Sequence, residues 1–225
     1  MTINKINKYP QNILINLSKL LEKEYNPKHA IRSIFSAKEK KYVLIKRNNY
    51  IEAAVLCILL SDKENLSLNN AKIILTVRSK NLKNHAGQVS FPGGKLDKLD
   101  KNLTECSLRE TYEEIGIHKS KIQTIGMMNK YITGTGFLIT PVIAILKEEV
   151  KYNINLEEVE KMIFFPLKVF KEVAGFKKSY FSNEKNEKFL YYDYTWKNYR
   201  IWGTTALILY DIYKILTNTF KKTYD

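Results

Sequence analysis

Short apolar runs separated by polar or glycine-containing segments dominate the chain from residue 51 onward. The runs occupy residues 51–60, 72–79, 89–91, 121–132 and 139–146. Runs of this length, bounded by turn-forming residues, are typical of β-strands. Strands that surround a few helices predict a mixed α/β domain of the α+β or sandwich type.

Helices are predicted in four places. Residues 1–40 are expected to form a helical N-terminal segment, whose clearest amphipathic stretch is ILINLSKLLEKE. Further helices are expected near residues 103–115, 156–172 and 203–219. Because the chain contains no internal repeat, low-complexity tract or linker, we predict one domain over residues 41–225, with the N-terminal segment packed on it.

The composition is that of a folded globular protein with a strongly basic balance. Of the 225 residues, 44% are hydrophobic and 12% aromatic, and the formal net charge is +14. Only five of the 37 basic residues are arginines, and the lysines are spread along the whole chain. A dispersed lysine excess does not predict a nucleic-acid groove, but it is compatible with steering of a polyanionic small substrate.

The sequence shows no signal for a membrane or for export. No apolar run approaches the ~20 residues of a spanning helix. The N-terminus lacks the apolar core of a signal peptide and the arginines of a mitochondrial transit peptide. Cys57 and Cys106 have no zinc-site spacing and are expected to be reduced core thiols. We therefore expect a cytoplasmic protein without a membrane partner, and the oligomeric state is left open.

The segment RETYEEIG, residues 109–116, concentrates negative charge in this lysine-rich chain. On a helical wheel, Glu110, Glu113 and Glu114 share one face. The opposite face, expected to be core, carries Leu108, Thr111, Tyr112 and Ile115. Like charges at this spacing destabilise a helix. A divalent cation with oxygen ligands, Mg²⁺ or Mn²⁺, is therefore favoured over a solvated acidic face.

The ends of this helix and the residue beside its carboxylates are also indicated by the sequence. Asn102 followed by Glu105 resembles an N-terminal capping pair, and Gly116 supplies the C-terminal stop. Arg109 lies at the edge of the carboxylate face, where we expect it to orient one carboxylate through a charge-assisted hydrogen bond.

The stretch GGKLDKLDKNLTECSLRETYEEIGI, residues 93–117, resembles the Nudix box, whose core is Arg-Glu-x-x-Glu-Glu-x-Gly. The match is complete at Arg109, Glu110, Glu113, Glu114, Gly116 and Ile117. Upstream, Asp100 replaces a glutamate and lies one residue farther from the arginine, so its role is left open. The resemblance implies a Nudix fold, an α/β/α sandwich with a mixed central sheet. It also implies hydrolysis of a nucleoside diphosphate linked to another group.

The residues before the box, LTVRSKNLKNHAGQVSFPGG (75–94), resemble the signature of the coenzyme A pyrophosphatase branch of this family. The resemblance implies substrate-binding roles for Arg78, Ser79, Lys83, Gly87, Gly93 and Gly94. Lys83 stands where the pattern has arginine, which keeps the charge but loses the two-pronged grip on phosphate. Lys80 is interpreted as a solvated lysine, whereas Arg78, one of only five arginines, is interpreted as functional.

Three later segments also resemble this branch, namely residues 133–146, 157–167 and 199–209. Four residues are candidates to line an adenine or pantetheine pocket: Tyr131, Thr135, Phe137 and Trp202. For these aromatic residues, packing in the core is the favoured interpretation.

By this resemblance, the chain is expected to be a Mg²⁺- or Mn²⁺-dependent hydrolase that splits coenzyme A into 3′,5′-ADP and 4′-phosphopantetheine. Glu110 and Glu114 are the expected metal ligands, and Glu113 is a third ligand or the residue that activates water. Arg109 is expected to hold Glu110 in position.

Two questions stay open at the level of sequence. The general base is not assigned, and loop carboxylates such as Glu148 or Glu149 are candidates. The substrate is the second question, because other Nudix substrates (NADH, ADP-ribose or a nucleoside triphosphate) would share the same helix. A basic nucleic-acid-binding protein with a degenerate box is disfavoured by the intact Arg-Glu-x-x-Glu-Glu motif.

Overall fold

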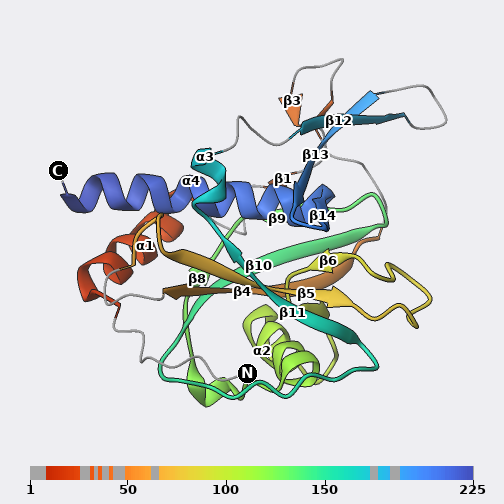
Figure 1. Ribbon diagram of the computed structural model, residues 1–225, viewed down its shortest axis with the longest axis horizontal. Helices are drawn as coiled ribbons and strands as arrows, with labels where there is room; N and C mark the ends of the chain where they lie inside the picture. Colours follow the sequence, from red (N-terminus) through yellow and green to blue (C-terminus); the bar gives the residue numbers. More distant parts are fainter. Residues whose placement is uncertain are drawn as a thin grey trace.

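The computed structural model contains helices and strands interleaved along the chain (Figure 1). The residues that it describes are 9–25, 31–32, 35–36, 41–42, 49–61, 66–172, 177–182 and 188–224. The helices are α1 (Gln11–Glu24), α2 (Leu103–Ile115), α3 (Val169–Glu172), α4 (Gly203–Tyr224) and the 3₁₀ turn η1 (Lys119–Lys121). The strands are β1 (Ile31–Arg32), β2 (Phe35–Ser36), β3 (Lys41–Tyr42), β4 (Ile51–Ser61), β5 (Ala71–Arg78), β6 (Val89–Ser90), β7 (Gly93–Lys95), β8 (Ile122–Met127), β9 (Lys130–Ile132), β10 (Phe137–Leu146), β11 (Val159–Pro166), β12 (Lys177–Ser182), β13 (Lys188–Trp196) and β14 (Tyr199–Trp202). Within these described residues, no helix is both long and apolar enough to cross a membrane.

A mixed sheet forms the centre of the molecule. Its strand order is β1-β9-β10-β4-β5-β11, and β6, β7 and β8 pair with β5, β4 and β10, respectively. β10 runs parallel to β4, from Phe137 opposite Ile51 to Ile145 opposite Leu59, whereas β5 is antiparallel to both β4 and β11. β4 and β5 are buried on both faces, which explains their nearly continuous apolar sequences.

Two apolar cores lie on opposite faces of this sheet. On one face, Leu108 and Ile115 of α2 pack with Ile58 and Ile74. α1 and α4 cover the other face (Figure 1), and their buried residues form a core that also contains Leu75. Successive residues of β5 thus enter different cores, as the pleat of a strand requires. The structure therefore confirms the α/β/α sandwich with a mixed central sheet.

The N-terminal segment is only partly helical. The amphipathic stretch forms α1, whose buried residues, Ile13, Leu14, Leu17, Leu20 and Leu21, follow helical spacing. A fully helical segment over residues 1–40 is wrong, because β1 pairs with β9 and β2 pairs with β13. The rest of residues 1–40, apart from Tyr9, Pro10 and Tyr25, lies outside the described residues. The division of the chain at residue 40 stays a prediction.

The helix expected near residues 156–172 is also wrong. Eight residues of this span, Val159–Pro166, form β11, which pairs antiparallel with β5, and only the four residues of α3 are helical. Ile163 and Phe165 lie in one core, whereas Met162 and Phe164 pack against the other. This alternation is the two-residue period of a strand. Pairing with β5, a long-range contact that the local pattern does not contain, decides the outcome.

A second sheet, which the sequence pattern did not indicate, lies beside α4. Its order is β12-β13-β2-β3, and β14 pairs with β13. Tyr194 of β13 and Ile201 of β14 are buried in the core that also contains residues of α4. β14 also packs beside β6, which pairs with the last residues of β5. The β13–β14 hairpin is thereby held near the end of β5.

Candidate active site

The helix α2 begins and ends where the sequence predicted. The Asn102 side-chain oxygen accepts the Glu105 backbone N–H at 3.0 Å, and Gly116 adopts a left-handed φ of 73°. A Cβ at Gly116 would lie 2.7 Å from the Asn153 Cβ, so this close approach also favours glycine. α2 therefore ends tightly against the loop that contains Asn153.

The buried face of α2 differs from the prediction at two positions. Leu108, Thr111 and Ile115 are buried as expected. Tyr112 is 54% exposed, so its assignment to the core is wrong, and Glu114 is only 2% exposed. The buried face differs from the expected one because α2 contacts both β4 and β7. These contacts centre the buried side of the helix near Thr111. One of the three glutamates therefore points into the protein.

Arg109 holds two of the carboxylates together. Its Nη1 donates to Glu110 Oε1 at 2.9 Å and to Glu113 Oε2 at 2.8 Å, and its Nη2 donates to the Lys95 carbonyl at 3.1 Å. The expected contact between Arg109 and Glu110 is thus present. Asp100 accepts two further hydrogen bonds from the same guanidinium. These bonds lower the pKa of Asp100, while burial opposes the effect.

Glu114 is a buried carboxylate with an unsatisfied oxygen. Its Oε2 has no hydrogen-bond partner among the described residues, and its Oε1 lies 3.8 Å from Arg78 Nη1. Burial raises the pKa of Glu114 to about 8; the Arg78 charge lowers it, and the charges of Glu110 and Glu158 raise it further. Burial also raises the pKa of Glu110. Arg78, from the segment before the box, therefore meets a glutamate of the box.

Glu158 lies near the carboxylates of α2, and the sequence analysis does not name it as a candidate. Its charge acts on the pKa of both Glu110 and Glu114. Asn155 Nδ2 donates to Glu158 Oε1 at 3.2 Å, and the Ser79 backbone N–H donates to the Glu158 carbonyl at 2.8 Å. The sequence does contain a signal for Glu158. It directly precedes the apolar segment 159–166, and if that segment is a strand beside β5, Glu158 lies near Arg78.

The two carboxylates named as possible bases lie elsewhere. Glu148 forms an exposed ion pair with Lys121, and Glu149 is exposed in the segment after β10. Glu158, in contrast, is among the charges that raise the pKa of both Glu110 and Glu114.

Gly93 and Gly94 lie directly beside the carboxylates. A Cβ at Gly94 would lie 2.4 Å from the Glu110 carboxylate carbon. A Cβ at Gly93 would lie 2.4 Å from the Ala54 carbonyl oxygen, and Gly93 has a φ of 149°. Both positions thus need glycine for a close approach, one to a side chain and the other to the backbone of β4.

The remaining predicted substrate-binding residues lie along the loop after β5. Ser79 is buried, with its backbone bonded to Glu158. Lys83 and Gly87 are exposed, and Gly87 has a left-handed φ of 69°. The structure therefore brings Arg78 and the glycines of β7 to the carboxylates, whereas Lys83 stays at the surface.

The four residues considered as candidates for an adenine or pantetheine pocket differ in how exposed they are. Tyr131 is a core residue, because it is 1% exposed and its hydroxyl lies 2.8 Å from Asp211 Oδ2. Trp202 is 39% exposed, so interpreting it as core is wrong. Thr135 is exposed and Phe137 is half-buried.

The carboxylates fit a hard divalent cation in their chemistry. They supply only oxygen donors, and the unsatisfied, buried Oε2 of Glu114 needs a compensating partner when it is ionised. No group of three or more metal-ligating side chains is close enough to hold an ion in the part of the chain that the structure describes. Arg109 instead lies between Glu110 and Glu113.

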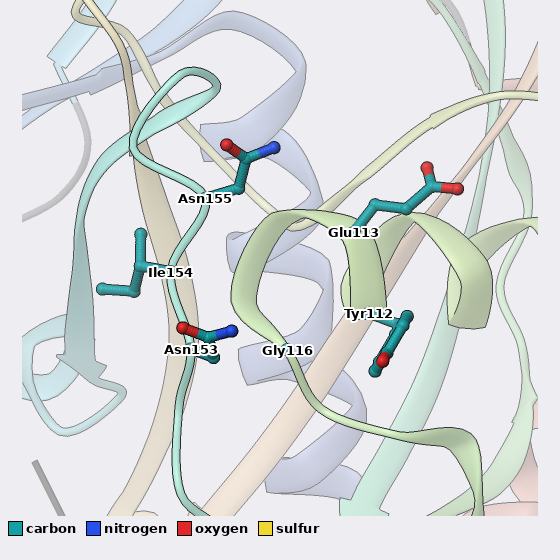
Figure 2. Close-up of a pocket in the computed structure, with 6 residues that line it drawn as sticks. All are labelled: Tyr112, Glu113, Gly116, Asn153, Ile154 and Asn155. Carbon is teal, nitrogen blue, oxygen red and sulfur yellow. The ribbon is translucent and has the colours of Figure 1, made fainter.

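A hollow of about 430 Å³ lies at the end of α2, beside Glu113 (Figure 2). Tyr112, Glu113 and Gly116 form one side, and the loop from Asn153 to Asn155 forms the other. Its lining residues include Glu113, Asn153 and Asn155 but no basic residue, and the Glu113 carboxylate points away from the loop (Figure 2). The hollow therefore suits a neutral group better than an anionic one.

Comparison with known proteins defines the class. The model of the NUDIX domain family matches residues 51–187. The Nudix hydrolase NudL of Photorhabdus laumondii, described as uncharacterized, is 32% identical over 165 residues, which cover 73% of this chain and 84% of that protein. NudL of Pectobacterium atrosepticum, described in the same way, is 32% identical over 142 residues, which cover 62% of this chain and 72% of that protein.

Solved structures similar to this chain include a binary complex of the C. elegans Ap4A hydrolase, with 19% identity, a TM-score of 0.42 and coverage of 55% of this chain and 85% of that one. The NUDIX domain of Shewanella oneidensis NrtR in complex with ADP ribose has 15% identity, a TM-score of 0.41 and coverage of 68% and 85%.

The chain belongs to the NUDIX family. It is a hydrolase that acts on pyrophosphate bonds, and enzymes of this family act on small nucleotide derivatives and generally use divalent metal ions.

Proposed function

We propose that this enzyme hydrolyses the diphosphate bond of coenzyme A, giving 3′,5′-ADP and 4′-phosphopantetheine. The observation that carries the proposal is the contact between the two motifs. Arg78, from the segment that resembles the coenzyme A pyrophosphatase signature, lies 3.8 Å from Glu114 of the Nudix box. An arginine of a merely solvated loop would extend into water and would not lie beside a buried carboxylate.

Four residues of α2 have roles in this reaction. Glu110 and Glu114 bind Mg²⁺ or Mn²⁺, and Glu113 is the third ligand. When bound, the cation neutralises the charge of the diphosphate and lowers the pKa of a bound water molecule. Arg109 orients Glu110 and Glu113 through Nη1, and Arg78 donates to a phosphate oxygen.

We infer that Glu158, rather than Glu148, accepts a proton from the attacking water. The Glu158 carboxylate is held by Asn155 and interacts electrostatically with Glu110 and Glu114. Glu148 is occupied by Lys121 at the surface. A general base has to lie within hydrogen-bond reach of the water from which it removes a proton, so a carboxylate beside the proposed metal ligands is favoured.

The proposal also covers the compartment in which the enzyme works and the partners that it binds. We propose a cytoplasmic enzyme with a small-molecule substrate and no nucleic-acid or membrane partner. In support, Cys57 and Cys106 are buried free thiols, which is usual in a reducing compartment. The dispersed lysines of the sequence support steering of an anionic substrate.

The experiment is a substrate panel. The purified full chain is incubated with Mg²⁺ or Mn²⁺ and, separately, coenzyme A, acyl-coenzyme A, NADH, ADP-ribose and nucleoside triphosphates, and the products are identified by mass spectrometry. We expect the highest kcat/KM with coenzyme A or its acyl derivatives. Preference for NADH or ADP-ribose would overturn the substrate assignment. An absence of hydrolysis together with salt-dependent RNA binding would overturn the enzymatic proposal.

A matched pair of variants controls this assay. Glu114→Gln is expected to lower turnover at least 100-fold, since it removes a proposed ligand. Glu148→Gln also removes one carboxylate charge, but from the exposed ion pair with Lys121, and should keep turnover within twofold. Equal effects of the two substitutions would exclude the proposed metal site.

A further inference from the structure

A strip of lysines and aromatic rings borders the active site at the edge of the main sheet. It consists of Lys80, Lys161, Trp196 and Tyr199. Lys80 Nζ lies 3.8 Å from Glu160 Oε2, and Lys161 Nζ lies 3.9 Å from Glu160 Oε1. Glu160 thus holds the two ammonium groups near each other.

The aromatic half of the strip comes from the β13–β14 hairpin. Lys161 Nζ lies over the Tyr199 ring, 5.1 Å from its centroid. The Tyr199 ring stacks on Trp196, with centroids 6.1 Å apart and an interplanar angle of 28°. A further ammonium group, Lys197 Nζ, lies 4.8 Å from the Trp196 centroid. The two rings are therefore adjacent, with the Lys161 ammonium over Tyr199 and the Lys197 ammonium over Trp196.

The strip lies beside the part of β5 that carries Arg78. Lys161 pairs with Val77, and the next residue of β5 is Arg78. Lys161 and Arg78 therefore belong to neighbouring strands, whose backbones are about 4.8 Å apart. Arg78 points toward Glu114 of α2, whereas Lys161 points toward Tyr199 of β14. A ligand whose diphosphate lies at Arg78 can extend around this edge of the sheet onto the strip.

Charge distinguishes the strip from the hollow at the end of α2. The hollow contains Glu113 and no basic residue, whereas the strip has two ammonium groups, those of Lys80 and Lys161, around the single carboxylate of Glu160. A phosphate monoester carries nearly two negative charges and needs several cationic donors. A purine ring stacks on aromatic side chains. A nucleotide that bears both groups is therefore complementary to the strip.

We infer that the strip binds the nucleoside end of the substrate, with the base against Tyr199 and Trp196 and a phosphate monoester, separate from the diphosphate, on Lys80 and Lys161. The inference rests on the proposed function, because coenzyme A carries such a monoester on its adenosine. The neutral pantetheine arm then extends in the other direction, toward Glu113.

Binding of product-like nucleotides tests the inference without catalysis. Calorimetric titration of the full chain with 3′,5′-ADP and with 5′-AMP compares a ligand that has the extra phosphate with one that lacks it. Lys80→Met and Lys161→Met should each weaken binding of 3′,5′-ADP about tenfold, because each removes one charge-assisted bond. Binding of 5′-AMP should change less than twofold. Equal losses for the two ligands, or no loss for either, would overturn the assignment of the lysines.

The matched control is Lys214→Met. Lys214 Nζ also lies over a tyrosine ring, 4.7 Å from the Tyr210 centroid, but on α4. This variant should bind both nucleotides as the parent does. If it loses 3′,5′-ADP binding as strongly as Lys161→Met, dispersed surface charge and not the strip recognises the ligand.

Tyr199 is tested by a pair of substitutions. Tyr199→Ala should weaken both nucleotides about tenfold, because it removes the stacking surface, while Tyr199→Phe should bind both normally. Thermal melts show whether the alanine variant is folded, and Tyr199→Leu replaces it if it is not. Normal binding by a folded Ala or Leu variant would contradict the stacking role.

Kinetics separate this inference from the proposed function. If the parent enzyme hydrolyses coenzyme A, Lys161→Met should raise KM for coenzyme A but not for 3′-dephospho-coenzyme A, with kcat unchanged for both. Unchanged KM values would reject the strip while leaving the proposed function intact. A parent enzyme that does not hydrolyse coenzyme A would reject the proposed function, and with it the assignment of the strip to that substrate.

Discussion

Arg109 and Asp100 form a two-pronged ion pair, with Nε 2.9 Å from Oδ1 and Nη2 2.9 Å from Oδ2. The Asp100 side chain is only 4% exposed. A turn presents it correctly, since the Asp97 backbone N–H donates to Asp100 Oδ2 at 2.8 Å. This turn lets the shorter aspartate reach the arginine despite the longer spacing. Asp100 thus fixes the guanidinium that in turn holds Glu110.

We predict that Asp100→Ala reduces both activity and stability. The loss of two charge-assisted bonds should lower the free energy of unfolding by about 1–2 kcal/mol, and the released guanidinium should lower kcat about tenfold or more by misplacing Glu110. Urea unfolding and steady-state kinetics measure the two effects. Asp193→Ala is the control, because Asp193 holds Arg200 in a similar fork on β13–β14. If the control loses as much activity, orientation of Glu110 is not the cause.

The two glycines of β7 should respond differently to alanine. Gly94→Ala places its Cβ against the Glu110 carboxylate, which is the end of a flexible side chain and can turn away. We expect a loss of activity of about 100-fold with a small change in stability. Gly93→Ala meets the fixed backbone of β4 at Ala54 and should lower the melting temperature by several degrees. The opposite ranking in thermal melts and kinetics would contradict this account.

The buried Glu114 should make the metal-free protein less stable at alkaline pH. Its pKa is about 8 in the folded state, against an ordinary value of 4.5. Unfolding therefore releases a proton between these values. The stabilisation is complete below about pH 4.5 and declines as the pH rises toward 8.

Thermal melts in EDTA across this range check the effect. Glu114→Gln, which stays neutral, should match the parent melting temperature near pH 5 and exceed it above pH 8. A difference of ~1 kcal/mol corresponds to about 2–4 °C in a protein of this size. Mn²⁺ should restore the parent at high pH but leave the variant unchanged. A constant difference between the two proteins at all pH values would exclude Glu114 as the titrating group.

Glu158→Gln should lower kcat by two or more orders of magnitude, as expected for loss of a general base. KM should change less than threefold if the carboxylate acts on water and not on substrate binding. Glu148→Gln and Glu149→Gln are the matched controls and should retain kcat within twofold. A loss of kcat confined to Glu148→Gln would identify the loop carboxylate as the base.

Local patterns predicted the parts of this protein that depend on neighbouring residues. The capping residue Asn102, the terminal glycine Gly116 and the contact between Arg109 and Glu110 are all encoded within a few positions. The apolar runs likewise predicted β4, β5 and β10, because strands buried on both faces need continuous apolar sequence.

The misassigned elements depend on distant partners. The local pattern of β11 predicts a helix, because its pairing with β5 is not visible in its own sequence. The exposed Tyr112 and the buried Glu114 were misplaced because the sheet covers a different arc of α2 from the one the wheel suggested. The second sheet was missed for the same reason, since β2 and β13 lie far apart in the chain.

By itself, the sequence determined the carboxylate helix, its ends and its resemblance to the Nudix box. The tertiary structure decided which carboxylates meet. Folding buries Glu114 beside Arg78 and holds Glu158 near both Glu114 and Glu110. It also ties Asp100 to Arg109 and sets the β13–β14 hairpin against Lys161. These relationships arise only when the strands align, because charges separated along the chain interact according to their distance in space.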